Sequence, residues 1–362
     1  NGVVYNEMKG AFSSPDDVLD REVFNSLFPE TPYGVESGGD PACIPDLTYQ
    51  DFLDFHGRYY HPSNSYIYLY GNMDMAERLE WMDQEYLSRF EAISIDSEIG
   101  EQACFCHGVE VKKQYPITDS EPLKENGYLA YNTVIGSSLD RELYVAFQIL
   151  DYVLCSAPGA PLKQALTDAG IGREIYSVYE NGIQQPYFSV VSKHTDISRK
   201  EDFLTVVRET LERLREQGID KKALRAAVNY YEFKYREADF GSYPKGLMYG
   251  LQALDSWLYD ENRPFLHVEA ADTFRLMRER VGTDYFEKLI GQYLLDNPHS
   301  SVVMVEPVRN LAAREEKAQR ERLAALKESM SGEELAALVS ETKALAAYQE
   351  APDTKEAVET IP

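Results

Sequence analysis

One hairpin-like stretch sets the architecture of this chain: residues 174–194 read EIYSVYENGIQQPYFSVVSKH. Two runs rich in β-branched and aromatic residues, Glu174–Tyr179 and Tyr187–His194, flank the dipeptide Asn181-Gly182. Such side chains favour strands, and Asn-Gly is the dipeptide that tight hairpin turns prefer. The stretch therefore predicts two antiparallel strands that are joined by a turn at Asn181-Gly182.

Strands and helices on both sides of this hairpin predict a complete domain over residues 108–307. Tyr128–Ile135 and Ser301–Val305 read as two further strands. Apolar residues recur between the strands at the spacing of one helical face: Leu143, Ala146, Phe147, Leu150 and Leu154, then Phe203, Val206, Val207, Thr210, Leu211 and Leu214. Helices clustered between hairpin strands indicate an α+β fold, in which helices pack on one side of an antiparallel sheet.

Residues 1–107 are predicted to form only part of a first αβ domain. Ser14-Pro15-Asp16-Asp17 and the pair Thr48 and Asp51 are helix-start signals, and the second helix is expected to end at Tyr60. Asp74 and Glu77 suggest a capping box for a third helix. Tyr66–Tyr70 reads as a strand, but one strand cannot form a sheet. We therefore expect its partner strands to precede residue 1.

The C-terminal part differs in composition and is predicted to be helical. Leu311–Met330 is rich in Ala, Arg, Glu and Leu, and Ser331 with Glu334 forms a capping-box pattern that restarts a helix. Two helices joined by so short a break predict an antiparallel helical hairpin over residues 308–350. Residues 351–362 lack periodicity and are predicted to be a linker.

Composition limits the classes of partner. Lys and Arg number 36 against 61 Asp and Glu, so the net charge is -25 and a nucleic acid would be repelled. The sequence holds no run of about 18 apolar residues, so we expect no membrane span. Four cysteines give no disulfide framework and fit a reducing compartment, which favours the cytoplasm of a bacterium.

The residues alone complete no catalytic or metal site. His56 and His61 are five apart and point to different faces of a helix, and Cys104, Cys106 and His107 have no second cluster to complete a tetrahedral site. Gly170-Ile171-Gly172 ends a helical segment, so it predicts a helix C-cap rather than a dinucleotide site. Neither H-E-x-x-H nor H-x-x-E-H occurs. The chain is therefore a binding protein or a fragment.

Several blocks, in order along the chain, carry a family resemblance. In the first 64 residues they are Gly2–Phe12, Ser37–Pro41, Ile44-Pro45, Leu47-Thr48 and Tyr60–Asn64. In the second predicted domain they are Ala160–Leu166, Gly170–Gly172 and Tyr187–Val190. These blocks resemble the presequence-protease branch of the pitrilysin and insulinase zinc metallopeptidases. The predicted helical hairpin resembles the connector between the two halves of those enzymes.

The resemblance implies a function and one site residue. Its enzymes are clamshells of four related αβ domains that enclose a peptide-degrading chamber. Zn²⁺ is held there by two histidines of an H-x-x-E-H motif and by a glutamate on a later helix, which matches Glu7 within Asn6-Glu7-Met8. A carboxylate is an acceptable third ligand that leaves room for a water. Because this chain lacks the histidine motif, we expect it to bind zinc weakly and to be inactive alone.

We therefore expect a fragment of a zinc-dependent endopeptidase that degrades short or unfolded peptides. Its partners would be peptide substrates, together with the missing N-terminal segment and the C-terminal half of the same protein. One alternative is a noncatalytic scaffold or partner subunit of the same superfamily. Another is a free-standing helical interaction module, in which Leu311–Glu350 binds a partner helix.

Overall fold

The computed structural model describes residues 2–238 and 240–361, which divide into two compact units. One unit comprises Asn1–Tyr115 and Ser120–Pro307. The other comprises Pro116–Asp119 and Val308–Pro362. A boundary between two αβ domains near residue 107 remains a prediction.

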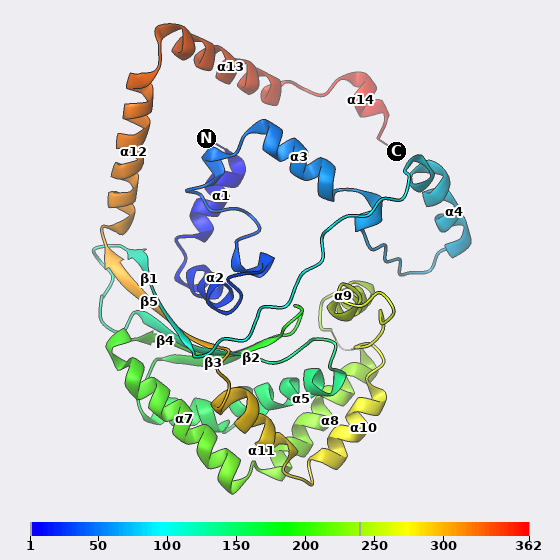
Figure 1. Cartoon of the computed structure of the whole chain (residues 1–362), viewed down its shortest axis with the longest axis vertical. Helices are drawn as coiled ribbons and strands as arrows, with labels where there is room; N and C mark the ends of the chain where they lie inside the picture. The colour runs from blue at the N-terminus through cyan, green and yellow to red at the C-terminus, as the bar shows by residue number, and fades with distance from the viewer. Residues whose placement is uncertain (1, 239, 362) are drawn as a thin grey trace. The chain divides into compact units, whose positions relative to one another are not determined.

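A five-stranded sheet organises the larger unit (Figure 1), with the strand order β1-β5-β2-β4-β3. The strands are β1 (Val109–Ile117), β2 (Gly127–Val134), β3 (Glu174–Glu180), β4 (Tyr187–Thr195) and β5 (Ser300–Arg309). Strand β2 pairs antiparallel with both β4 and β5, and β3 pairs antiparallel with β4. The predicted antiparallel sheet and its four predicted strands in residues 108–307 are confirmed.

The predicted turn at Asn181-Gly182 is wrong, although the hairpin itself is present. Glu180 is paired with Tyr187, so residues 181–186 form a longer loop. Backbone groups of this loop bind neighbouring segments: the carbonyl oxygen of Gln184 accepts from Ser138 N at 2.9 Å, and that of Pro186 accepts from Ile135 N at 2.6 Å. The loop is thus shaped by contacts outside the hairpin, which a two-residue turn could not make.

Helices cover one face of the sheet (Figure 1), as predicted. They are α5 (Arg141–Asp151), α6 (Pro161–Asp168), α7 (Lys200–Gln217), α8 (Lys221–Glu237), α10 (Ala271–Arg280) and α11 (Tyr285–Leu289), with two π-helical turns, η5 (Tyr152–Ser156) and η7 (Ile290–Leu295). Their apolar faces and the sheet enclose the core, whose fully buried side chains include Leu129, Phe147, Phe188, Phe203, Phe274 and Phe286. Amphipathic spacing therefore located this layer correctly.

One apolar run passes through this core. The run Arg141–Asp168 is long and apolar enough to cross a membrane, but 61% of its most apolar window is buried inside the protein. It contains α5, η5 and α6. The predicted C-cap after α6 is confirmed, because Gly170 has φ 62° and the amide of Ile171 donates to Leu166 O at 3.0 Å.

The opposite face of the sheet is packed against helix α2 (Pro15–Leu27), which begins at the predicted cap Ser14. A buried polar network joins the two. The hydroxyls of Ser26 and Ser301 are hydrogen bonded at 2.8 Å, and Asn132 Nδ2 donates to Ser301 Oγ at 3.1 Å. Ser189 Oγ donates to Asn132 Oδ1 at 2.5 Å. The network therefore links α2 to β5, β2 and β4.

Tyr66–Tyr70 does not form the predicted strand. The segment is extended, but it pairs with no strand in the described chain and instead lies against α9 (Lys245–Trp257). Two glycines of α9 allow this approach, because a Cβ on Gly246 would overlap Tyr70 and one on Gly250 would come within 2.9 Å of Tyr68. The strand propensity was read correctly, whereas a strand also needs a backbone partner.

The remaining N-terminal helices are α1 (Val3–Ala11), α3 (Tyr49–Tyr59) and α4 (Met75–Glu85). Short 3₁₀ turns lie at Pro32–Gly34, Ile44–Asp46, Pro62–Asn64, Leu87–Arg89 and Ile197–Arg199. Thr48 and Asp51 form the predicted capping box of α3. Asp74 accepts from the amide of Glu77 at 3.1 Å, so the predicted start of α4 is also confirmed. Helix α3 buries none of its residues.

The smaller unit contains α12 (Leu311–Ser329), α13 (Gly332–Glu350) and α14 (Lys355–Glu359). Ser331 and Glu334 form the predicted capping box of α13. Helices α12 and α13 make few contacts with each other, so their pairing along the helix axes is looser than a packed hairpin. The predicted linker 351–362 is partly wrong, because Thr354 caps the short helix α14 there.

Candidate metal ligand and acidic pocket

Glu7 lies on α1, in the first part of the chain. The neighbouring residue Met8 is 8% exposed and faces inward, whereas Glu7 is exposed. Gly38 packs directly on Met8, since a Cβ at Gly38 would overlap the Met8 sulfur. The Ser37–Pro41 block thus holds the helix at the residue next to Glu7.

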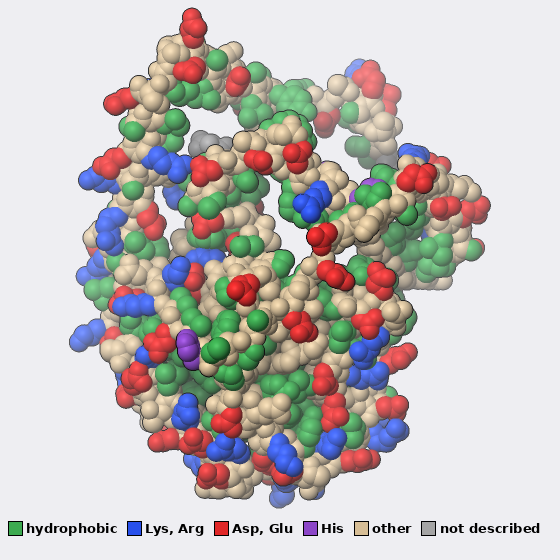
Figure 2. Space-filling view, viewed as in Figure 1, with side chains coloured by type: hydrophobic (Ala, Val, Ile, Leu, Met, Phe, Trp, Pro, Cys, Tyr) green, Lys and Arg blue, Asp and Glu red, His purple; other side chains and the backbone are tan. Residues whose placement is uncertain are grey.

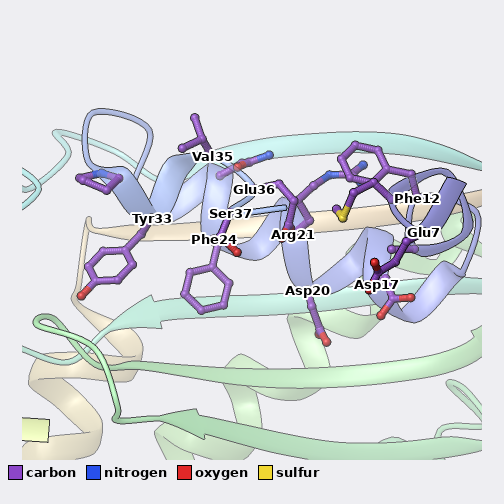
Figure 3. Close-up of a pocket in the computed structure, with 14 residues that line it drawn as sticks. Glu7, Phe12, Asp17, Asp20, Arg21, Phe24, Tyr33, Val35, Glu36 and Ser37 are labelled. Carbon is purple, nitrogen blue, oxygen red and sulfur yellow. The ribbon is translucent and has the colours of Figure 1, made fainter. Parts of the chain in front are cut away.

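Glu7 borders a pocket of about 470 Å³. Its walls come from α1, from α2 and from the segment 32–37 (Figure 3). Glu7 and Asp17 lie toward one end of the pocket in this view, and Tyr33 lies at the other. The side chains Phe12, Phe24 and Tyr33 add aromatic surface to the walls. The predicted ligand therefore lies in a concave site rather than on a flat surface.

The pocket is acidic. Four carboxylates line it, those of Glu7, Asp17, Asp20 and Glu36, against one guanidinium, that of Arg21. Arg21 stacks over the ring of Phe12 at 3.7 Å. Burial raises the pKa of Asp20, and the neighbouring Asp16 carboxylate raises it further, whereas Lys193 lowers it. An excess of carboxylates favours a cation or a positively charged group here.

Salt bridges and hydrogen bonds fix α2, which forms one wall of this pocket. Lys193 on β4 pairs with Asp16 at 2.5 Å, and Lys113 on β1 pairs with the buried carboxylate of Glu22 at 3.3 Å. At the other end of α2, a ring nitrogen of His299 lies 2.9 Å from Leu27 O. The sheet thus positions the pocket wall. Sequence reasoning missed Asp17 and Asp20, because it interpreted the acidic run only as a helix-start signal.

The residues present supply one candidate zinc ligand and not a complete site. Across residues 2–238 and 240–361, no three His, Cys, Asp or Glu side chains are grouped to hold a metal. His56 stacks on Tyr60 at 4.6 Å, and His61 Nδ1 accepts from Ser63 N at 3.1 Å, so the two serve separate local contacts. Cys104 and Cys106 are exposed free thiols. A tetrahedral zinc site needs about three protein ligands, so Glu7 alone supports no catalytic step.

Solved structures with this fold include peptidase domains. A structure described as the peptidase M16 inactive domain from Pseudomonas fluorescens superposes with a TM-score of 0.62 at 17% identity, covering 84% of this chain and 69% of that one. At this identity the likeness shows the fold alone.

Sequence similarity identifies the family. Residues 46–231, just over half of the chain, match the family model described as Peptidase M16 inactive domain, and residues 305–362 match the model of a segment associated with subgroup C of the M16 peptidases. This chain belongs to the M16 peptidase family. It is 44% identical over 362 residues to Protein HypA of Clostridium perfringens, covering 100% of this chain and 37% of that protein. It is 35% identical over 369 residues to Presequence protease 1, chloroplastic/mitochondrial, of Arabidopsis thaliana, covering 100% of this chain and 34% of that protein.

The chain thus spans about a third of the length of these relatives. It contains a domain of the type described as inactive, within a family of peptidases.

Proposed function

We propose that this chain is part of a zinc-dependent endopeptidase that degrades short or unfolded peptides in an enclosed chamber. The observation that carries the proposal is the position of Glu7, an exposed carboxylate beside an acidic pocket on a helix packed under Ser37–Pro41. Within the described residues, no ion pair or hydrogen bond occupies this carboxylate. The similarity to a presequence protease along the whole chain supports the same function.

In the complete protein, Glu7 would be the third protein ligand of Zn²⁺. When bound, the metal would supply Lewis-acid chemistry and a water of lowered pKa. The other two ligands and the general base would come from outside this chain. The sheet and helices of residues 108–307 would form chamber wall, and α12 and α13 would connect the two halves of the protein. Peptides, those further segments and a bacterial cytoplasm are the proposed partners and setting.

The test compares Glu7→Gln with the matched variant Glu36→Gln in the full-length protein, because both carboxylates line one pocket. Glu7→Gln is expected to lose bound zinc and to lower kcat/KM for an unstructured peptide by at least ~100-fold, since a metal contributes several kcal/mol to the transition state. Glu36→Gln is expected to keep its zinc. Metal analysis and peptide cleavage check both. Unchanged zinc in Glu7→Gln would remove the assignment.

The second candidate is a noncatalytic scaffold of the same family, which the match to a domain described as inactive favours. The two proposals differ in one measurement. A scaffold predicts that the full-length wild-type protein neither binds zinc nor cleaves an unstructured peptide, whereas the endopeptidase predicts both.

A further inference from the structure

A second cavity lies in the helical layer, away from Glu7. It has a volume of about 160 Å³ and is enclosed by α7, by the π-helical turn η7 and by strands β2 and β5. Six of its eight lining side chains are aliphatic: Leu204, Val207, Leu211, Leu294, Leu295 and Val302. An apolar cavity of roughly 150 Å³ inside another protein stays dry and accepts benzene, so the space here matches a small hydrocarbon group.

The polar groups of the cavity are Tyr131 and Arg208. The hydroxyl of Tyr131 is already committed, because it donates to Leu294 O at 2.8 Å, and burial raises the pKa of Tyr131 to about 12. Tyr131 therefore presents an aromatic wall rather than a free donor. Arg208 is exposed, lies close enough to Tyr131 to affect its ionisation, and has no ion-pair partner among the described residues.

The charge next to Arg208 is accounted for. Asp296 follows Leu295, and its carboxylate pairs with Arg215 at 3.4 Å. Arg215 lies two helical turns after Arg208 on α7, so this acid is engaged by another guanidinium. Arg208 is thus left as an unpaired cation beside an apolar space. Guanidinium groups bind carboxylates in a planar, two-point geometry.

The local backbone also departs from regular structure at this cavity. In η7 the amide of Asp296 donates to Gly291 O at 2.9 Å, five residues back, which widens the turn that carries Leu294 and Leu295. Single π-helical turns occur frequently at functional sites. Leaving an apolar cavity of this size unfilled also costs stability, so a ligand that fills it would stabilise the fold.

We propose that this cavity binds a small apolar carboxylate, whose hydrocarbon part fills the space between α7, η7 and the sheet while its charge pairs with Arg208. The ligand could be a free acid or the C-terminal residue of a peptide, because both present an apolar group next to a carboxylate. The site is independent of Glu7 and requires no metal, so its test does not depend on the proposed peptidase activity.

The test uses calorimetric titration of the 362-residue chain with 3-phenylpropanoate, with its neutral analogue 3-phenylpropan-1-ol and with the peptide acetyl-Gly-Gly-Phe. Both carboxylates, or one of them, are expected to bind at least ~10-fold more tightly than the alcohol, because a hydrogen bond to a charged group is worth that factor or more. Binding of 3-phenylpropanoate alone identifies a free acid, and binding of the peptide alone identifies a peptide end.

Two variants decide the roles of charge and space. Arg208→Gln is expected to reduce carboxylate binding to the level of the alcohol, while Arg213→Gln, an exposed arginine of the same helix that does not line the cavity, is expected to leave it unchanged. Leu204→Phe fills the cavity and is expected to abolish binding of all three probes. No saturable binding up to about 10 mM, or equal binding by wild type and Arg208→Gln, would overturn the proposal.

Discussion

Asp255 is a carboxyl group that the fold removes from water. It lies on α9, and the hydroxyl of Tyr144 donates to its Oδ2 at 2.7 Å. Burial is the main reason why its pKa rises to about 7, with a further increase from Glu180 and a decrease from the Tyr144 hydrogen bond. Tyr144 in turn stacks on buried His267 at 3.7 Å. The protein therefore favours the neutral form of this acid.

The raised pKa predicts how stability depends on pH. Since the folded pKa exceeds that of the unfolded chain, the contribution of Asp255 is fully present below about pH 4 and is lost as pH rises to about 7. Asp255→Asn is expected to remove this loss, which amounts to about 4 kcal/mol at most. Urea unfolding at pH 5 and pH 8 measures it. Exposed Glu261→Gln is the control, and an equal pH slope in Asp255→Asn and wild type would contradict the prediction.

Single residues were predictable where the signal was local. The C-cap at Gly170 and the capping boxes of α3 and α13 each depend on residues within a few positions, and all three are present. Asp255 was not predictable, because its burial comes from α5 and the β3–β4 loop, which are distant in sequence. The acidic neighbours of Glu7 were missed for the same reason, since α1 and α2 meet only in the folded chain.

At the scale of elements, one asparagine connects three strands and a helix. Asn132 is fully buried on β2 and bonds to Ser301 and Ser189, while Ser301 bonds to Ser26 of α2. Each hydroxyl that loses its partner inside the protein costs the free energy of desolvation, about 1–3 kcal/mol. The network is therefore the specific part of the contact between α2 and the sheet.

Substitutions along this network are expected to differ in a graded way. Asn132→Ala leaves two hydroxyls without a partner and is expected to lower the free energy of unfolding by about 2–4 kcal/mol. Ser26→Ala removes only the outermost member, so about 1 kcal/mol is expected. Urea unfolding monitored by circular dichroism measures both. Equal effects would show that α2 is held by its apolar face alone.

Elements were predictable where their own pattern carried the signal. The strands at the centre of the sheet and the amphipathic helices of the core follow their hydrophobic periods. Strand β1 was missed because its charged residues, such as Lys112 and Lys113, reflect an edge position with an exposed side. Tyr66–Tyr70 shows the reverse error, since strand propensity cannot reveal that the segment lies on Gly246 and Gly250 of α9.

The whole molecule carries a large negative charge, -25 from 36 basic and 61 acidic residues. Figure 2 shows acidic and basic side chains spread over the visible face. Self-repulsion of a net charge destabilises a compact state, and salt screens it: the Debye length falls from about 30 Å at 0.01 M to about 8 Å at 0.15 M. Screening of this kind should be visible in stability measurements.

We expect the urea midpoint at pH 7.5 to rise as NaCl increases from about 0.01 M to about 0.15 M, because screening then weakens repulsion across the molecule. Sucrose at matched osmolality controls for effects that do not depend on charge. A midpoint that falls with salt would contradict the prediction. It would mean that ion pairs such as Lys112 with Glu306 outweigh the net repulsion.

The packing of α2 on the sheet has a consequence for synthesis of the chain. Ser26 and Ser301 are 275 residues apart, so a ribosome that adds about 5–20 residues each second needs roughly 14–55 s before the second can meet the first. Throughout that interval Val18, Val23 and Leu27 lack the surface that buries them in the finished protein. The nascent polypeptide is thus a natural client for a chaperone near the exit tunnel, and faster translation of the intervening codons shortens its exposure.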